Sequence, residues 1–169
     1  MIGALKPNLY MISYQEALDI ISKHPFDLGL ESINLLEANG RILAEDIQAD
    51  RDLPPYDRVT MDGIAINYEA YNEGQRTFEV IETIGAGIPQ KTFSTKAKCV
   101  QIMTGAIMPI GLDTVIRYED ISLTDDKATI NVDTVVRQQN IHFKGEDRSQ
   151  GEIVLGKGKL LGPPELIVA

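Results

Sequence analysis

Three short stretches of this sequence place a polar residue next to glycine, and chemistry is most readily built there. They are Met61-Asp62-Gly63, Met103-Thr104-Gly105-Ala106 and Gly145-Glu146-Asp147. Glycine lets the backbone turn closely around a ligand, and adjacent free N–H groups form a nest that binds anions. A neighbouring carboxylate holds a hard cation such as Mg²⁺ through its oxygens. Together the three stretches predict a site for a metal-bridged phosphate or another oxyanion.

Each stretch also has an ordinary structural explanation. Asp62-Gly63 is typical of a turn before a strand. Thr104 follows an apolar run, where a threonine either caps a turn or donates its hydroxyl to a ligand. The glycines of Gly85-Ala86-Gly87 indicate a flexible turn, because no GxGxxG pattern or Walker lysine accompanies them.

The segment 53–66 leads into the first of these stretches. Pro54 and Pro55 fix φ and remove two backbone donors, so the chain enters the segment extended. Asp57, Arg58 and Thr60 then offer a carboxylate, a guanidinium and a hydroxyl. The segment therefore predicts an acid, Asp62, at the mouth of a strand.

Other chemistries are less well supported. His24 and His142 are the only histidines and there is no G-x-S-x-G elbow, which disfavours a hydrolytic triad. His24 is expected at the exposed end of a helix. His142 is either a base beside Asp147 or a histidine on the rim of the site. Adjacent acids such as Glu119-Asp120 point to opposite faces of a strand, which excludes a glycosidase pair there.

Composition narrows the class of protein. The chain of 169 residues is long enough for one sizeable core or two small ones. A net charge of −9 argues against general binding to nucleic acid or anionic membranes. No apolar run approaches the ~20 residues of a membrane span, and residues 1–10 do not look like an export signal, so we expect a cytoplasmic protein. The single cysteine, Cys99, is predicted to be a buried thiol.

The predicted elements begin with a helix at about 13–23, where Ser13 and Glu16 form a capping box. A short strand at 31–36 and a second helix at 36–44 are predicted next, the latter weakened by Asn39-Gly40. From residue 64 to 136, short β-like runs separated by turn residues predict a largely antiparallel module with a hairpin tip at Asp125-Asp126. The runs are 64–66, 78–84, 98–103, 113–118, 128–132 and 134–136.

The last part contains a strand at 153–155 and a helix that starts at Pro163-Pro164. The sequence ends before that helix has three turns. We therefore expect these residues to be the front of a longer protein.

The order and spacing of these stretches resemble the N-terminal region of the MoeA family, the molybdopterin molybdenumtransferases, to which the gephyrin E domain also belongs. Nearly the whole chain after residue 12 is covered. Residues 37–46, EANGRILAED, are similar to the family's EA-GRVLAED. The remaining matches are 55–63 (PYDRVTMDG), 102–106 (IMTGA) with Pro109 and Gly111, 113–115, Asn140-Ile141 followed by 145–147 (GED), and 164–166.

The resemblance implies an enzyme that inserts molybdenum from molybdate into adenylylated molybdopterin and releases AMP, in a Mg²⁺-assisted step of molybdenum cofactor synthesis. It implies a homodimer, with the active site shared between this region of one subunit and the pterin-binding domain of the other. A molybdopterin adenylyltransferase is the expected upstream partner. The region alone is expected to be inactive. The alternative is a non-catalytic protein-interaction or dimerisation module, since gephyrin relatives anchor receptor peptides.

The resemblance also implies the site residues. Asp62, Thr104 and Asp147 stand where family members have functional residues. We assign Asp62 and Asp147 to metal or oxyanion organisation and Thr104 to a hydrogen bond that orients the substrate. The glycines expected to contact the bound cofactor are Gly63, Gly105 and Gly145. The chain departs from the family at Val59, where a serine is usual, and at 142–144, where arginines are common.

The fold expected from these observations is α+β and β-rich, a small mixed α/β domain with an inserted, mostly antiparallel β domain. The first domain is predicted to be discontinuous, at about 1–48 plus 149–169. The inserted domain is predicted at about 49–148.

Overall fold

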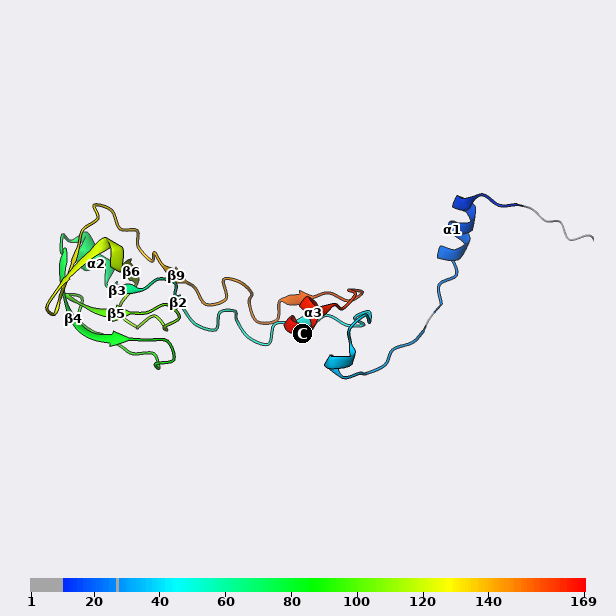
Figure 1. Ribbon diagram of the computed structural model, residues 1–169, viewed down its shortest axis with the longest axis horizontal. Coiled ribbons are helices and arrows are strands. Elements are labelled where there is room, and N and C mark those ends of the chain that lie inside the picture. The colour runs from blue at the N-terminus through cyan, green and yellow to red at the C-terminus, as the bar shows by residue number, and fades with distance from the viewer. Residues whose placement is uncertain (1–10, 27) are drawn as a thin grey trace, which may run out of the picture.

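The molecule is elongated, with a β-rich body at one end, a narrow two-strand neck and a smaller part beyond it (Figure 1). The computed structural model describes residues 11–26 and 28–169. The helices, including the short 3₁₀ turns η1 and η2, are α1 (Tyr14–Ser22), η1 (Leu35–Glu37), α2 (Tyr68–Asn72), η2 (Tyr118–Asp120) and α3 (Pro163–Val168). The strands are β1 (Ile47–Gln48), β2 (Arg58–Val59), β3 (Gly63–Ile66), β4 (Thr77–Ile84), β5 (Lys98–Ile102), β6 (Thr114–Arg117), β7 (Ile121–Thr124), β8 (Lys127–Ile130), β9 (Ile141–His142) and β10 (Ile153–Leu155).

The body is a curled six-stranded sheet in the order β6-β3-β5-β4-β8-β7. All its pairs are antiparallel except β4 with β5, which run parallel. The predicted β-rich, mostly antiparallel module is therefore confirmed. β7 and β8 form the hairpin predicted at Asp125-Asp126, and Asp125 takes a positive φ of 53° at its tip.

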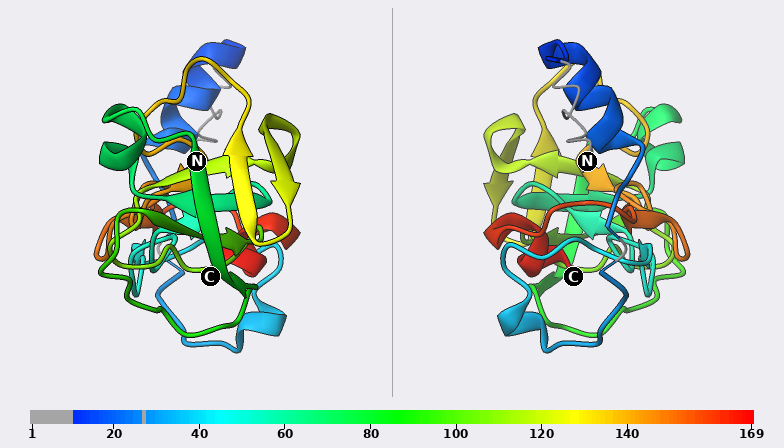
Figure 2. Two further views of the ribbon diagram at one scale, coloured as in Figure 1. Left: turned by 90° about the vertical axis from the view of Figure 1, so that its left-hand side faces the viewer. Right: turned by 90° about the vertical axis from the view of Figure 1, so that its right-hand side faces the viewer.

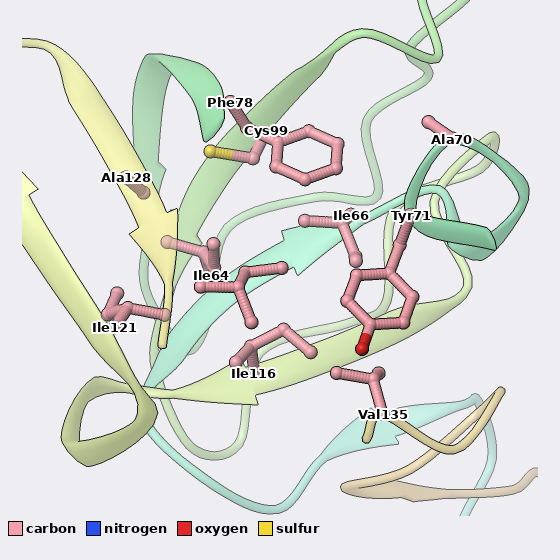
Figure 3. Close-up of a cluster of buried hydrophobic side chains, with 11 residues drawn as sticks. Ile64, Ile66, Ala70, Tyr71, Phe78, Cys99, Ile116, Ile121, Ala128 and Val135 are labelled. Carbon is pink, nitrogen blue, oxygen red and sulfur yellow. The ribbon is translucent and has the colours of Figure 1, made fainter. Parts of the chain in front are cut away.

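Both faces of the central strands are buried, because side chains that alternate along a strand enter two different apolar clusters. On β3, Ile64 and Ile66 face one cluster, shown in Figure 3, while Ala65 faces the other. The first cluster also holds Cys99, which is 1% exposed, as expected of a structural thiol. The second cluster includes Val59 of β2, so this short strand packs against the sheet.

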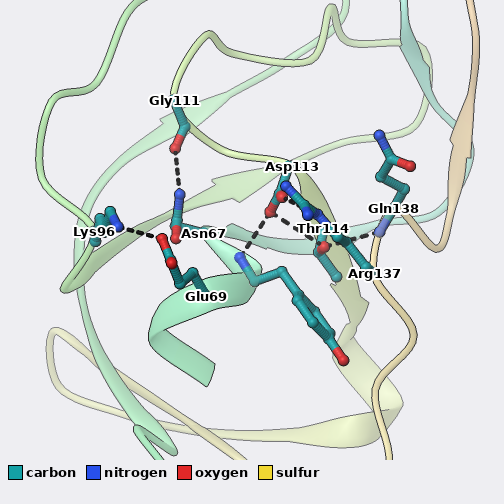
Figure 4. Close-up of polar contacts among 9 residues, drawn as sticks. Asn67, Glu69, Lys96, Gly111, Asp113, Thr114, Arg137 and Gln138 are labelled. Atoms are coloured by element: carbon teal, nitrogen blue, oxygen red, sulfur yellow. Dashed lines mark hydrogen bonds and ion pairs between the residues drawn. The ribbon is translucent and has the colours of Figure 1, made fainter. Parts of the chain in front are cut away.

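A polar network anchors α2 to the end of β6 (Figure 4). The carboxylate of Asp113 accepts hydrogen bonds from the backbone N–H of Tyr68 at 2.7 Å and from the Arg137 guanidinium at 3.0 Å. Thr114 Oγ1 in turn accepts from the N–H of Gln138 at 3.0 Å. The sequence prediction missed α2, whose five residues are too few to give a helical period.

The neck consists of two chain segments that run out from the body and back again. β2 pairs with β9 where the segments leave the body, and β1 pairs with β10 at the other end. Between these pairs, Leu53 N donates to Arg148 O at 2.8 Å and Ala49 N donates to Glu152 O at 2.8 Å. Figure 2 views the molecule along the neck from both ends. The predicted division at about 49–148 stays a prediction, and residues 1–10 and 27 of its first part lie outside the described residues.

The elements beyond the neck agree only partly with the sequence prediction. The first helix is confirmed as α1, with Ser13 and Glu16 making the capping box. The strand at 31–36 and the helix at 36–44 were wrong, because Gly40 takes a positive φ of 79° and this segment bonds to the C-terminal part instead. Gly40 N donates to Leu161 O, and Leu43 N donates to Lys159 O.

Two smaller differences and one further agreement concern single elements. Residues 134–136 form no strand, and β7 was not predicted. α3 begins at the predicted Pro163. Within the described part of the chain, no helix is long and apolar enough to cross a membrane.

Candidate functional site

Antiparallel pairing brings two of the predicted site residues together. Gly63 of β3 lies opposite Ile102 of β5. Because the two strands run in opposite directions, the residue just before β3 and the residues just after β5 emerge at the same end of the sheet. Asp62 and Thr104 occupy these positions.

Asp62 and Thr104 make a two-point contact. Oδ1 of Asp62 accepts from Thr104 N at 2.6 Å and from Thr104 Oγ1 at 2.8 Å. The backbone hydrogen bond, followed by the side-chain bond, holds the pKa of Asp62 below its usual value. The Asp62 carboxylate is solvent-exposed and ionised at neutral pH, and the bonds from Thr104 keep it ionised to a lower pH.

The direction of the second bond limits what Thr104 does toward a ligand. An ionised carboxylate only accepts hydrogen bonds, so the Thr104 hydroxyl proton must be donated to Asp62. The Thr104 oxygen then has lone pairs left for a donor or a cation. In this arrangement Thr104 orients a ligand by accepting, and does not donate a proton to an oxyanion.

Tyr118 is close to the same carboxylate. Its N–H donates to the backbone carbonyl of Asp62 at 3.2 Å. Burial, and then the negative charge of Asp62, raise the pKa of the Tyr118 phenol. The sequence analysis did not single out Tyr118, and its distance of 56 residues along the chain from Asp62 left no local signal.

Gly63 has a packing role. A Cβ at this position would lie 1.8 Å from the carbonyl oxygen of Ile116 on β6. A separation under 3.0 Å cannot be accommodated without moving the backbone, so only glycine allows β3 and β6 to pair this closely.

The backbone N–H groups of the two glycine turns are already used within the chain. In the first turn Gly105 N donates to Val59 O and Ala106 N to Met103 O. In the second turn Gly145 N donates to Pro54 O and Asp147 N to Leu53 O. The expectation that these turns form open anion-binding nests is therefore not met. Ligand contacts at this site depend on side chains.

The turn that carries Asp147 is fastened to the proline segment. Besides the two backbone bonds above, the N–H of Lys144 donates to Asp57 Oδ1 at 2.9 Å. Lys144 Nζ lies 3.3 Å from Asp52 Oδ2, and this contact contributes to the lowered pKa of Asp52, second to the N–H of Gln150. Gly145 takes a φ of 74°, which favours glycine at the centre of the turn.

His142 lies beside Asp147. Its Nε2 is 3.0 Å from Asp147 Oδ1 and 3.8 Å from Glu146 Oε2. On the other side of the ring, Nδ1 is 3.1 Å from the guanidinium of Arg58. The ring thus lies beside Asp147 with the His142 side chain 22% exposed, and both interpretations of it, as a base or as a histidine on the rim of the site, stay predictions. His24, by contrast, is exposed after α1 as expected.

β2 connects the two halves of the predicted site. On one edge, Val59 N donates to Ala106 O and Gly105 N to Val59 O. On the other edge, β2 pairs with β9, with Arg58 opposite His142. Within the described residues, no hydrogen bond or ion pair joins Asp62 directly to Asp147, and no group of three or more histidine, cysteine, aspartate or glutamate side chains could hold a metal ion.

Comparison with known proteins gives the family. The sequence profile described as "MoeA N-terminal region (domain I and II)" matches residues 12–169. A molybdopterin molybdenumtransferase of Synechocystis sp. is 38% identical over 156 residues, 90% of this chain and 40% of that protein. One from Staphylococcus epidermidis is 38% identical over 151 residues, 87% of this chain and 36% of that protein.

Solved structures agree. The molybdopterin biosynthesis MoeA protein from Pyrococcus horikoshii OT3 matches with a TM-score of 0.84 and 35% identity, over 94% of this chain and 43% of that chain. Another solved structure, of a molybdopterin biosynthesis MoeA protein from Pyrococcus horikosii, gives a TM-score of 0.76 and 28% identity over 94% of this chain and 41% of that chain. The chain spans about 40% of the length of the curated relative from Synechocystis. It therefore belongs to the MoeA family, of which it carries the N-terminal region.

Proposed function

We propose that this chain is part of a molybdopterin molybdenumtransferase, which inserts molybdenum from molybdate into adenylylated molybdopterin and releases AMP. Its curated relatives bear the name of this enzyme, and its own polar residues suit the task. The proposal includes a homodimer that receives its substrate from a molybdopterin adenylyltransferase. The 169-residue chain by itself is proposed to be inactive.

The observation that carries the proposal is the pair Asp62 and Thr104. Two donors from Thr104 fix Oδ1 of Asp62 and keep the carboxylate ionised. The second oxygen, Oδ2, has no hydrogen-bond or ion-pair partner among the described residues. A fixed, exposed anion of this kind suits the organisation of a cation at a phosphoanhydride, where preorganised charge contributes most to catalysis.

We propose that these residues bind a Mg²⁺ ion that keeps several of its water ligands. Mg²⁺ commonly keeps several water molecules and binds through one or two carboxylates together with substrate phosphates. Asp62 is proposed to supply one such carboxylate, and Asp147, whose side chain is 60% exposed, is proposed as the second. Bound there, Mg²⁺ would neutralise phosphate charge, while Asp62 and Thr104 orient its ligands.

The test is the substitution Asp62→Asn in the full-length enzyme, with conversion of adenylylated molybdopterin followed in the presence of molybdate. Asn keeps the size and an acceptor oxygen but removes the charge, so we expect kcat to fall by about 10²-fold or more. Asp125→Asn is the matched control. It also removes one exposed carboxylate, at a hairpin tip where asparagine tolerates the positive φ. Equal activity of both variants, with correct folding, would contradict the proposal.

The alternative function is a protein-interaction or dimerisation module. The observation that favours it is the apolar surface around α1, none of whose residues is buried. Tyr14, Ile21 and Phe26 are 79%, 68% and 94% exposed. An interaction module would lose partner binding with Ile21→Asp and keep it with Asp62→Asn. The enzyme would lose turnover with Asp62→Asn.

A further inference from the structure

His142 links two segments that carry different parts of the predicted site. Its ring lies between Arg58, 84 positions earlier in the chain, and Asp147, with separations of 3.1 Å and 3.0 Å at its two nitrogens. The side chain is 22% exposed, so water reaches only part of it. Both ring nitrogens are thus engaged by charged side chains.

These contacts determine which nitrogen carries the proton. A guanidinium has only donors, so Arg58 donates and Nδ1 must accept with its lone pair. An ionised carboxylate only accepts, so Nε2 must carry hydrogen and donate to Asp147. With both hydrogen bonds made, Nε2 carries the hydrogen and Nδ1 the free lone pair. The other histidine has the opposite arrangement, since Nδ1 of His24 lies 2.8 Å from the carbonyl oxygen of Ile20 and donates to it.

The two residues that contact the His142 ring belong to different parts of the predicted site. Arg58 belongs to β2, whose backbone also holds the turn of Thr104 through Gly105 N and Ala106 O. The main chain of Asp147 is held by the bond from its N–H to Leu53 O and by the bond that its carbonyl oxygen accepts from the Arg148 guanidinium, but neither bond fixes the rotation of the carboxylate. The bond from His142 to Asp147 fixes that rotation with reference to β2.

We propose that His142 is a positioning residue, which orients the Asp147 carboxylate relative to the Thr104 turn through the chain Arg58, His142, Asp147. The inference rests on the proposed function only for the role of the oriented Asp147 carboxylate in the reaction. The geometry of the ring is independent of it.

The first test observes the ring directly. In the 169-residue chain labelled with ¹⁵N-histidine, long-range ¹H–¹⁵N spectra at neutral pH separate the two tautomers. We expect one Nε2–H ring and one Nδ1–H ring, assigned with His24→Gln. Arg58→Met combined with Asp147→Ala, which removes both ring contacts, should change the ring signals of His142 and leave those of His24 unchanged. An Nδ1–H ring at His142, or a His142 signal unchanged by the double substitution, would overturn the proposal.

The second test separates positioning from packing in the full-length enzyme. In His142→Gln the side-chain amide reaches the place of Nε2 and keeps a donor for Asp147. In His142→Asn it reaches only the place of Nδ1 and faces Arg58. We expect kcat to fall about tenfold in His142→Asn and to stay within about threefold of the unsubstituted enzyme in His142→Gln, because one hydrogen bond to a charged group is lost only in the former. Equal losses in both variants would mean that the ring only fills space, and would overturn the proposal.

The two tests also distinguish this inference from the proposed function. If the enzyme does not convert adenylylated molybdopterin, the proposed function fails, and the tautomers and their response to the double substitution still decide the geometry of His142. If turnover is present and His142→Gln and His142→Asn are equivalent, the function stands and the positioning role fails.

Discussion

At the scale of single residues, the pKa of Asp62 depends on Thr104. The two donors of Thr104 meet one oxygen of the carboxylate and lower its pKa, with the backbone bond as the larger cause. A group whose pKa is lower in the folded state stabilises the fold above its unfolded pKa, and that contribution disappears as the pH falls through the folded pKa. The contact therefore links acid stability to the predicted site.

Thr104→Val tests this link. Valine keeps the shape and the backbone donor but removes the hydroxyl, so we expect the pKa of Asp62 to rise part of the way toward its usual value. Carboxyl ¹³C chemical shifts measured through a pH titration give this pKa. At neutral pH, Thr104→Val should be less stable than the unsubstituted protein. This difference in stability should vanish at pH values below the pKa of Asp62 in the folded protein. Thr129→Val, which removes a hydroxyl bonded only to Thr77, is the control and should leave the pKa of Asp62 unchanged.

At the scale of elements, the pairing of β3 with β6 depends on Gly63. Alanine there would place its Cβ 1.8 Å from the Ile116 carbonyl oxygen, and both atoms are fixed to backbone. We expect Gly63→Ala to lower the free energy of unfolding by about 1–3 kcal/mol or more, the usual cost of overpacking. Urea denaturation measures this cost. Gly85→Ala is the control, since its Cβ would meet nothing within 4 Å; a similar loss there would show that the strand contact is not the cause.

The attachment of α2 depends on Asp113 in the same way. Asp113→Ala leaves the N–H of Tyr68 without its acceptor and frees Arg137, so we expect a loss of about 1–2 kcal/mol, comparable to the loss of a helix cap. Urea denaturation also measures this loss, with Asp126→Ala at the hairpin tip as a control. A change of less than a few tenths of a kcal/mol in Asp113→Ala would contradict an anchoring role.

The sequence predicted the elements that local pattern determines. Five of the six strands of the body, all except β7, were predicted because apolar residues mark them, and α1 because Ser13 and Glu16 form a recognisable cap. The segment 31–44 was mispredicted because its bonds to 159–161 are tertiary. The neighbourhood of Asp62 and Thr104 follows from strand pairing once β3 and β5 are known. The contact between Arg58 and His142 could not be predicted in this way, because no sequence pattern near either residue indicates that they lie together.

At the scale of the whole molecule, burial is concentrated in the β-rich body. Both apolar clusters consist of residues between 59 and 141, whereas β1 and β10 form only a two-stranded sheet. Isolated two-stranded sheets are marginally stable, so the two ends of the molecule should differ in local stability.

Amide hydrogen exchange measures this difference residue by residue. We expect the slowest exchange at the central strands β3 and β5, and exchange at least tenfold faster at Ala49 and Leu161, whose N–H groups bond beyond the body. Phe78→Ala, which opens a cavity in the first cluster, should accelerate exchange in the body and leave Leu161 unchanged. Uniform acceleration at both ends would show that the molecule unfolds as one unit.

The neck also determines where the chain can be cut and rejoined. Ala49 and Gly151 are one hydrogen bond from each other, with Gly151 N donating to Ala49 O at 2.9 Å. The body thus enters and leaves the rest of the chain through neighbouring points. Residues 50–150 could be excised and closed head-to-tail by a short glycine linker, and the body could be circularly permuted by opening it at the Asp125 hairpin. We expect either product to keep Asp62, Thr104 and Asp147 together on one chain.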